Sequence, residues 1–260
     1  MMATRVPRSA APLAAYVLHR YDWSESSLIL DLFTREQGRL AVAAKGAKRP
    51  YSQLRAVLLP FQRIHLTLGR APGAEGAAEV HNLRGAEWAG GPPMLTGAAL
   101  FSGFYLNELL LKLVARQDPH PVLFDVYAAT LAALGAGADE GGAEIALRAF
   151  ELALLREIGV LPDLSRVTAT QGALVGDGRY ALHAEAGLGV VGAADVGLSG
   201  SAWVELQAAL VHGSVAALQG ACAAVLPELK GLLRGQLHYH LGSSALRTRQ
   251  VMVEAQNLER

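Results

Sequence analysis

Length and composition predict a folded protein with a sizeable core, because 52% of the 260 residues are apolar. The net charge of zero argues against a polyanionic partner, but charge is segregated: residues 1–90 hold 12 Lys and Arg against 7 Asp and Glu, residues 91–227 hold 6 against 13, and residues 228–260 hold 5 against 3. Basic ends around an acidic middle are typical of a protein with one surface that faces a polyanion, although ordinary scatter of solvated charge is an alternative.

The amino-terminal residues 1–12 are expected to form a flexible basic arm. Their arginines are followed by only a short apolar run and by no small-residue cleavage site, so this start does not match a secretory signal. Later apolar stretches are broken by Asn107, Lys112, Glu205 or His212 well before the ~20 residues that a membrane span needs. We therefore expect a cytoplasmic protein that does not contact a membrane.

The segment 13–88 is expected to form a small β-barrel. Apolar and polar residues alternate in short runs that are separated by turn-rich pieces. The expected strands are residues 15–21, 27–34, 39–45, 57–68 and 77–83. Several short strands in one compact stretch are typical of a small barrel, which can bind nucleic acids, proteins or sugars.

A cationic turn follows the third expected strand. Lys45, Lys48 and Arg49 lie within five residues, and Gly46 permits close approach of the backbone. This concentration of charge suits a phosphate backbone, and a solvated barrel face is the alternative. The candidate contacts to nucleic acid are Arg20, Arg35, Arg39, Lys45, Lys48, Arg49 and Arg63. Aromatic platforms for bases could come from Tyr21, Trp23 or Tyr51.

The apolar period becomes helical after the Gly-Gly-Pro-Pro segment 90–93. The expected helices are residues 95–115, 121–134, 143–159, 201–225 and 227–241. Residues 93–163 and 201–250 are therefore assigned to an α-helical domain, and residues 251–260 to a tail. Its last basic residues either extend a basic surface or end a solvated helix: Lys230, Arg234, Arg247 and Arg249.

The expected helix 143–159 has two distinct stripes. The first is apolar and indicates a core contact: Leu147, Phe150, Leu154 and Ile158. The second is apolar in its middle and cationic at both ends: Arg148, Leu152, Leu155 and Arg156. That mixture suits a short acidic and apolar peptide with a free carboxylate. A second core contact, with arginines extending beside it to solvent, is the alternative.

No catalytic motif is found in the sequence. It contains no GxxxxGK[ST] nucleotide loop, no HExxH metal motif and no GxSxG nucleophile motif. His238 and His240 lie two residues apart on an expected helix, so they point to opposite sides and do not easily chelate one ion. Cys222 is the only cysteine and lies in an apolar run, where we expect a buried, inert thiol. The sequence predicts a protein that is not an enzyme and uses no cofactor or metal.

Five segments, in chain order, resemble the RecO family of bacterial recombination mediators. They read DWSESSLILDLFTREQGRLAVAAKGAKRP, LFSGFYLNELLLKL, DPHPVLFDVYAATLAAL, LRAFELALLREIGVLPDL and ELKGLLRGQLHYHLGSSALRTRQVM. The resemblance implies an α+β multidomain protein, with an amino-terminal OB-fold barrel followed by a mainly α-helical domain that carries a small glycine-rich subdomain.

The same resemblance implies a nucleoid-associated protein of DNA repair and recombination. It would bind single- and double-stranded DNA, anneal complementary strands, dock on the carboxyl-terminal tail of the single-stranded DNA-binding protein SSB, and work with RecR to help load RecA. The SSB tail is an acidic, apolar peptide of the kind that the stripe of Arg148, Leu152, Leu155 and Arg156 would suit. A protein-interaction scaffold whose barrel binds a peptide or RNA is the alternative.

The glycine-rich residues 164–200 depart from this family pattern. Many RecO proteins carry two CxxC pairs here, at positions that correspond approximately to Val167, Thr170, Gly192 and Asp195. A structural zinc site needs four Cys or His ligands, and His183 alone cannot supply them. We therefore expect a degenerate zinc-ribbon-like subdomain that binds no zinc and is either held by packing or mobile.

Overall fold

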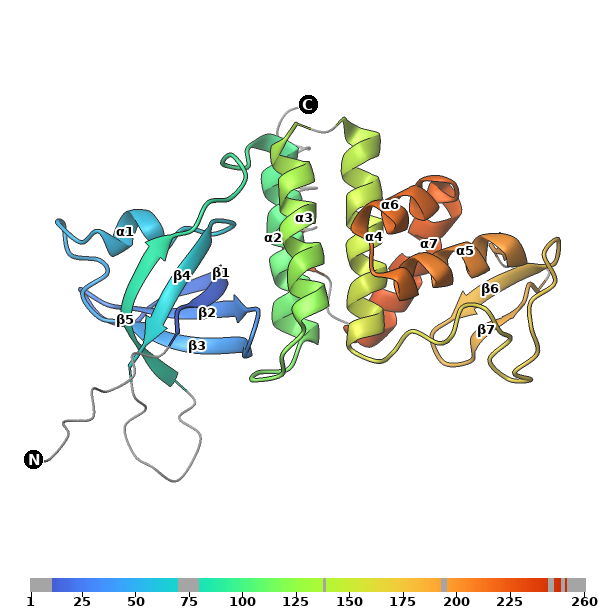
Figure 1. Cartoon of the computed structure of the whole chain (residues 1–260), viewed down its shortest axis with the longest axis horizontal. Coiled ribbons are helices and arrows are strands. Elements are labelled where there is room, and N and C mark those ends of the chain that lie inside the picture. The colour runs from blue at the N-terminus through green and yellow to red at the C-terminus, as the bar shows by residue number, and fades with distance from the viewer. Residues whose placement is uncertain are drawn as a thin grey trace, which may run out of the picture. The chain divides into compact units, whose positions relative to one another are not determined.

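The computed structural model describes residues 11–69, 80–137, 139–192, 196–242, 246–248 and 251 (Figure 1). The chain divides into two compact units. Met1–Gly91 with Ala115–Pro121 form the barrel unit, and Pro92–Val114 with Val122–Arg260 form the helical unit. Most of the expected basic arm 1–12 and tail 251–260 lies outside the described residues, as do Asp195 and Arg249.

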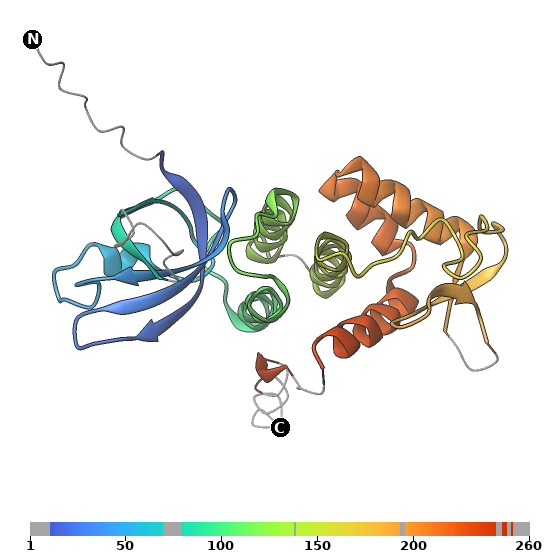
Figure 2. The same cartoon turned by 90° about the horizontal axis from the view of Figure 1, so that it is seen from below.

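Five strands close the barrel in the order β1-β2-β3-β5-β4 (Figures 1 and 2). They are β1 (Leu13–Asp22), β2 (Leu28–Thr34), β3 (Gly38–Ala44), β4 (Arg63–Leu68) and β5 (Val80–Trp88). Neighbouring strands are antiparallel, except that β3 and β5 are parallel. This closed five-stranded barrel confirms the expected OB-type fold.

Two expected strand boundaries are wrong. The strand expected over 57–68 begins only at Arg63, because residues 54–57 form the short helix α1 (Leu54–Val57). The last strand runs over Val80–Trp88 rather than 77–83, and residues 77–79 lie outside the described part of the chain. Period-two alternation predicts that a strand exists more reliably than it predicts the first and last residues of that strand.

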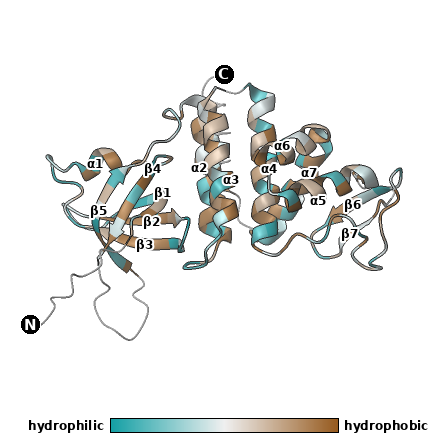
Figure 3. Cartoon of the chain, viewed as in Figure 1, coloured by the Kyte–Doolittle hydropathy of each residue, from teal (hydrophilic) through white to brown (hydrophobic). Residues whose placement is uncertain are grey.

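Alternating apolar residues of β1, β2, β3 and β4 form the barrel core. Figure 3 colours the chain by hydropathy, with apolar residues in brown. Leu30 pairs with Val42 and Leu32 with Leu40 across the two strands, and all four side chains are buried. Burying one such side chain contributes about 1.5–3 kcal/mol. The period-two pattern of the sequence therefore predicts the core face correctly.

Residues 115–121 belong to the barrel unit, although the sequence assigned them to the helical domain. The Gln117 backbone N–H donates to the Arg39 carbonyl at 2.9 Å. Gly38 lies against the same segment with φ of 68°, and a Cβ atom there would lie 2.0 Å from the Asp118 carbonyl oxygen. Only glycine permits this approach, so the β2–β3 turn and the segment 115–121 fit together closely.

Six helices form most of the described helical unit (Figure 1). They are α2 (Gly97–Leu113), α3 (Pro121–Gly135), α4 (Glu140–Glu157), α5 (Gly200–His212), α6 (Val215–Ala223) and α7 (Leu226–His240). The central helix α4 packs against α2, α6 and α7. No single helix of the described chain has the length and hydropathy of a membrane span, and only the sharply bent pair α6 and α7 meets that test together.

The helix expected over 201–225 is two helices. Gly213 ends α5 with φ of 75°, and the Ser214 hydroxyl caps α6 by accepting from the Ala217 N–H at 3.3 Å. A left-handed glycine followed by a serine cap is a stop and start signal that the continuous apolar pattern concealed.

The glycine-rich segment contains a small sheet of order β7-β6-β8. Its strands are β6 (Arg179–His183), β7 (Gly187–Val190) and β8 (Leu198–Ser199). Trp203 of α5 is fully buried beside it and donates its indole N–H to the Tyr180 carbonyl at 2.9 Å. The described residues of the glycine-rich segment are therefore held by packing, which was one of the two expected alternatives.

Candidate nucleic-acid interface and peptide groove

A hollow of about 440 Å³ lies beside the cationic turn of the barrel unit. Its lining combines three cations, one carboxylate and an apolar floor: Arg20, Lys48, Arg55, Asp22, Leu28, Ala47 and Leu58. Strand pairing explains the convergence, because β1 places Asp22 opposite Leu28, and β3 places Ala44 opposite Leu28 on its other side. The ends of three strands therefore bring cations together that are far apart in sequence.

The two arginines that line this hollow come from different elements, Arg20 from β1 and Arg55 from α1. Arg20 donates from Nη1 to the Leu58 carbonyl at 3.3 Å, which fixes its guanidinium against the wall. Arg55 is exposed on α1. Sequence reasoning missed Arg55, which lies two residues before the strand expected over 57–68 and instead belongs to the short helix α1.

The cationic turn itself presents two exposed cations, Lys45 and Arg49. Gly46 adopts a left-handed φ of 73°, and the Arg49 N–H donates to its carbonyl at 3.1 Å. Lys48 is different, because its ammonium already lies 3.0 Å from an Asp22 carboxylate oxygen and 3.1 Å from the Ser24 carbonyl. Lys45 and Arg49 are therefore better placed than Lys48 to bind a phosphate.

Arg39 must be removed from the predicted interface. Its side chain is buried and lies 3.3 Å from the carboxylate of Asp31, which is also buried. Arg116 lies 3.3 Å from the same carboxylate. A buried guanidinium that is paired with a carboxylate cannot face a phosphate, so Arg39 is a structural residue of the barrel.

The other two predicted arginines lie away from the hollow. Arg35 follows the end of β2 that is opposite to Leu28. Arg63 begins β4, where it pairs with Tyr16 near the start of β1 rather than with the end that carries Arg20. The structure thus brings together Arg20, Lys45, Lys48 and Arg49, and it separates Arg35 and Arg63 from them.

Three aromatic side chains near the cations are exposed, as the sequence suggested. Trp23 is 56% exposed, Tyr21 is 48% exposed and Tyr51 is 99% exposed. Tyr21 packs edge-on against His19, with ring centroids 4.4 Å apart. Large exposed rings beside cations are the usual composition of a surface that binds single-stranded nucleic acid.

The expected peptide face on α4 is wrong for three of its four residues. Leu152 and Leu155 are fully buried, and Arg148 is buried beside Glu151, with 2.7 Å between Nη2 and Oε1. Tyr105 donates its hydroxyl to the same carboxylate oxygen at 2.6 Å. Other helices cover this stripe of α4, so the alternative of a second core contact holds for all but Arg156, which is exposed.

The buried Glu151 carboxyl has a perturbed pKa. Burial, the largest influence, raises the pKa, while the Arg148 charge and the Tyr105 hydrogen bond act in the opposite direction. Oε2 of Glu151 has no hydrogen-bond partner among the described residues. The group is part of the packing of the unit and offers no surface to a ligand.

Arg156 instead borders an apolar groove of about 120 Å³ within the helical unit. Val122 and Val126 of α3 and Ala153 of α4 contribute apolar wall. The remaining lining residues are Glu157, Leu210, Val211, Gly213, Ser214, Val215 and Leu218. Sequence reasoning missed this groove because its walls come from four helices, and helical periodicity describes each helix by itself.

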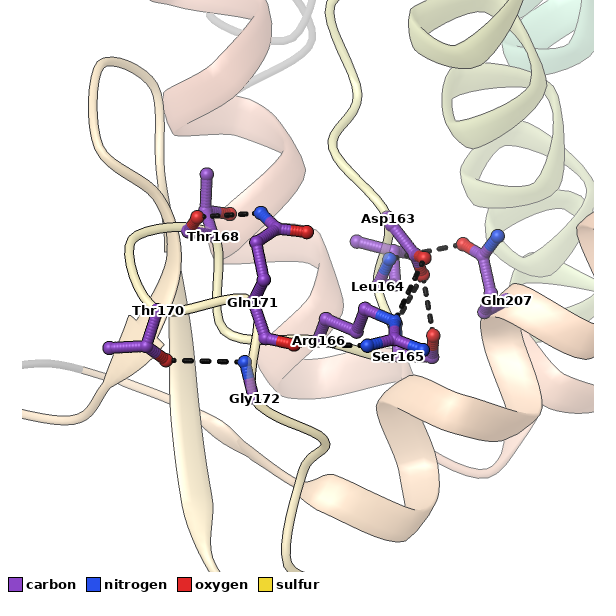
Figure 4. A network of polar contacts seen from close by, with 9 residues as sticks. All are labelled: Asp163, Leu164, Ser165, Arg166, Thr168, Thr170, Gln171, Gly172 and Gln207. Atoms are coloured by element: carbon purple, nitrogen blue, oxygen red, sulfur yellow. Dashed lines mark hydrogen bonds and ion pairs between the residues drawn. The ribbon is translucent and has the colours of Figure 1, made fainter.

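Val167 and Thr170, which correspond approximately to one expected CxxC pair, lie in a hydrogen-bonded turn (Figure 4). Val167 donates its N–H to the Gly172 carbonyl at 2.9 Å, and the Thr170 hydroxyl accepts from the Gly172 N–H at 3.3 Å. The Thr168 hydroxyl accepts from the Leu188 N–H at 2.8 Å, which ties the turn to β7. Among the described residues, no three His, Cys, Asp or Glu side chains gather around a possible metal position.

Two family models match the chain in succession. The model described as Recombination protein O N terminal matches residues 12–87, and the model described as Recombination protein O C terminal matches residues 94–250. DNA repair protein RecO of Polaromonas naphthalenivorans (strain CJ2) is 53% identical over 247 residues, or 94% of this chain and 96% of that protein. DNA repair protein RecO of Acidovorax ebreus (strain TPSY) is 51% identical in an alignment of length 261 that covers 96% of this chain and 99% of that protein. With both models matched and relatives this similar over nearly their whole length, the chain belongs to the RecO family of DNA repair proteins.

Proposed function

We propose that this protein is a non-enzymatic recombination mediator that binds single- and double-stranded DNA through the barrel unit. The observation that carries the proposal is a hollow lined by Arg20 and Arg55, next to a turn that exposes Lys45 and Arg49. Exposed aromatic rings lie close to these cations in the chain. Phosphate contacts of this kind need positive charge rather than a base sequence. Annealing of complementary strands would follow, because a cationic surface reduces the repulsion between two phosphate backbones.

The test of DNA binding is an electrophoretic shift with one single strand at two salt concentrations. Lys45→Ala and Arg49→Ala should each weaken binding and reduce the slope of log affinity against log salt by about 0.7 for each lost contact. Arg84→Ala is the matched control, since Arg84 is an exposed cation on β5 that belongs neither to the turn 45–49 nor to the lining of the hollow. Equal effects of all three changes would mean that the cationic turn has no special part in binding.

We further propose that the SSB tail docks in the groove beside Arg156, and that RecR and RecA act with the protein on SSB-coated strands. The groove offers an apolar wall for a hydrophobic tip, and Arg156 offers a cation for a carboxylate. This moves the docking proposal away from Arg148, Leu152 and Leu155, which are buried.

Calorimetry with a peptide of the SSB tail tests the groove. Arg156→Glu should weaken binding by about 1.5 kcal/mol or more, the scale of a lost hydrogen bond to a charged group. Arg234→Glu is the matched control, because Arg234 is an exposed cation of α7 that does not line the groove. If a folded Arg156→Glu variant binds the peptide like the wild type, the tail docks elsewhere.

A further inference from the structure

We propose that Lys48 is a positioning residue, which holds Trp23 outward as a stacking platform for unpaired bases. The interface would thereby favour single strands over duplex DNA. This inference rests on the proposed function and names its preferred substrate. It assigns Lys48 a different role from the phosphate contact that its charge first suggests.

The Lys48 ammonium binds both residues that flank Trp23. It lies 3.0 Å from Oδ1 of Asp22 on one side, and it donates to the carbonyl of Ser24 at 3.1 Å on the other. A cation that bridges the two neighbours of an aromatic residue restricts the backbone on which the ring is carried. The position of Trp23 therefore depends on this ammonium.

Backbone contacts join the same loop to the cationic turn. The Lys48 N–H donates to the Ser26 carbonyl at 3.0 Å, and the Gly46 N–H donates to the Ser27 hydroxyl at 3.4 Å. Within the loop, the Trp23 N–H donates to the Ser27 carbonyl at 3.2 Å. The loop and the turn are thus joined by backbone and side-chain hydrogen bonds, and the ammonium of Lys48 is the charged side chain that ties them together.

Lys48 is also the least suitable of the turn's cations for a phosphate. Its side chain is 32% exposed, and the Asp22 carboxylate already neutralises it locally. Lys45 and Arg49 are exposed on the same turn. These contacts support a division of roles, in which Lys45 and Arg49 bind phosphate and Lys48 positions Trp23.

Trp23 itself has the exposure that a stacking platform needs. More than half of its surface is open to solvent. Trp23 directly follows Asp22 in the chain, and Asp22 lines the cationic hollow. The faces of paired bases are covered by their neighbours in a duplex, whereas a single strand can turn its bases onto a ring. Stacking on Trp23 would therefore strengthen single-strand binding and leave duplex binding to the phosphate contacts.

The first arm of the test compares two exposed tryptophans. Trp23→Ala should weaken binding of an oligo(dT) strand about 5- to 140-fold, the range that corresponds to one lost base stack, and change duplex binding less than about twofold. Trp88→Ala is the control, because Trp88 is 64% exposed at the end of β5, where it pairs with Ile64 of β4 rather than with the loop that carries Trp23. Unchanged oligo(dT) affinity in folded Trp23→Ala overturns the inference.

The second arm separates positioning from phosphate contact by a double-mutant cycle. Lys48→Met should weaken oligo(dT) binding in the wild type but cause no further loss in a Trp23→Ala background, with the salt slope unchanged. If Lys48→Met instead weakens single-strand and duplex binding equally and lowers the salt slope, Lys48 is a phosphate contact and the positioning role is wrong.

A third arm observes the loop without DNA. In a Trp88→Phe background the emission comes from Trp23 and from Trp203, which is fully buried. Lys48→Met should lower the fluorescence anisotropy of this variant, because Trp23 becomes more mobile, and unchanged anisotropy contradicts the clamp. Absence of DNA binding by the wild type would instead overturn the proposed function, whatever the anisotropy shows.

Discussion

The pKa of Glu108 is set by burial and by the hydrogen-bond donors around its carboxylate. Glu108 of α2 accepts from the backbone N–H groups of Arg247 and Thr248, both at 3.0 Å, and from the Thr248 hydroxyl. The Lys112 ammonium lies 3.0 Å away. Burial opposes ionisation of Glu108, but the hydrogen bonds from Thr248, Arg247 and Lys112 outweigh it and lower the pKa from 4.5 to about 2.

We expect acid to release this carboxyl-terminal contact. A carboxyl whose pKa is lowered on folding stabilises the fold above its unfolded pKa, so the stabilisation is lost as the pH falls from 4.5 to about 2. Hydrogen exchange at the Arg247 and Thr248 amides measures the release. The Glu108→Gln variant should show weaker protection already at neutral pH and little change with acid. Equal protection of the wild-type amides across that interval would contradict the assignment.

At the scale of elements, short local signals decide where helices end and how the small sheet is held. The left-handed Gly213 separates α5 from α6, and no neighbouring heavy atom lies within 4 Å of a Cβ built there. Gly220 lies inside α6 with equally open space. The two glycines therefore differ in backbone conformation alone.

Alanine at these two glycines should have opposite effects on stability. Gly213→Ala forces a Cβ into a left-handed conformation and should lower the free energy of unfolding by about 1–2 kcal/mol. Gly220→Ala removes flexibility from a helix interior and should raise it by about 0.5–1 kcal/mol. Denaturant unfolding of both variants measures the difference. Effects of the same sign would show that helix propensity, not the left-handed cap, governs this junction.

The turn that contains Val167 and Thr170 should be stable without metal. We expect no stoichiometric zinc by elemental analysis and an unchanged melting temperature after chelator treatment, since hydrogen bonds close the turn. Thr168→Val removes the acceptor of the Leu188 N–H and should cost about 1–3 kcal/mol. One tightly bound zinc per chain would contradict this prediction.

At the scale of the whole molecule, the two proposed surfaces belong to different units. The cationic hollow belongs to the barrel unit, and the groove beside Arg156 belongs to the helical unit. The two surfaces suit different ligands. The hollow would bind a polyanion through clustered positive charge, and the groove would bind an apolar peptide with the help of a single cation. Their functions should therefore be separable.

Separate loss of the two activities is the expected outcome of annealing assays. Arg156→Glu should preserve annealing of bare complementary strands and impair annealing of strands coated with SSB, because only the second reaction needs the tail. Lys45→Ala with Arg49→Ala should weaken both reactions while peptide affinity stays at the wild-type value. A single variant set that removes peptide and DNA binding together would argue for one shared site.

The sequence by itself determined that a barrel precedes a helical half, and it determined which face of the barrel strands is apolar. Period-two alternation predicts the barrel core of Leu30, Leu32, Leu40 and Val42, and the change of period after residues 90–93 predicts the helical half. Val167 and Thr170 stand where the family resemblance would place a CxxC pair, so the sequence predicts no zinc site there. These features are local, so a pattern along the chain records them.

Only the tertiary structure decided which charged residues are exposed and can contact a ligand. Arg39 and Arg148 read as surface cations in the sequence, yet each is buried against a carboxylate, Asp31 and Glu151. Arg55 attracted no attention in the sequence, yet it lines the hollow. Periodicity places a residue on a face of its own strand or helix, but burial depends on what packs against that face. That is set by contacts between residues far apart in the chain, such as Asp31 with Arg116, 85 positions away.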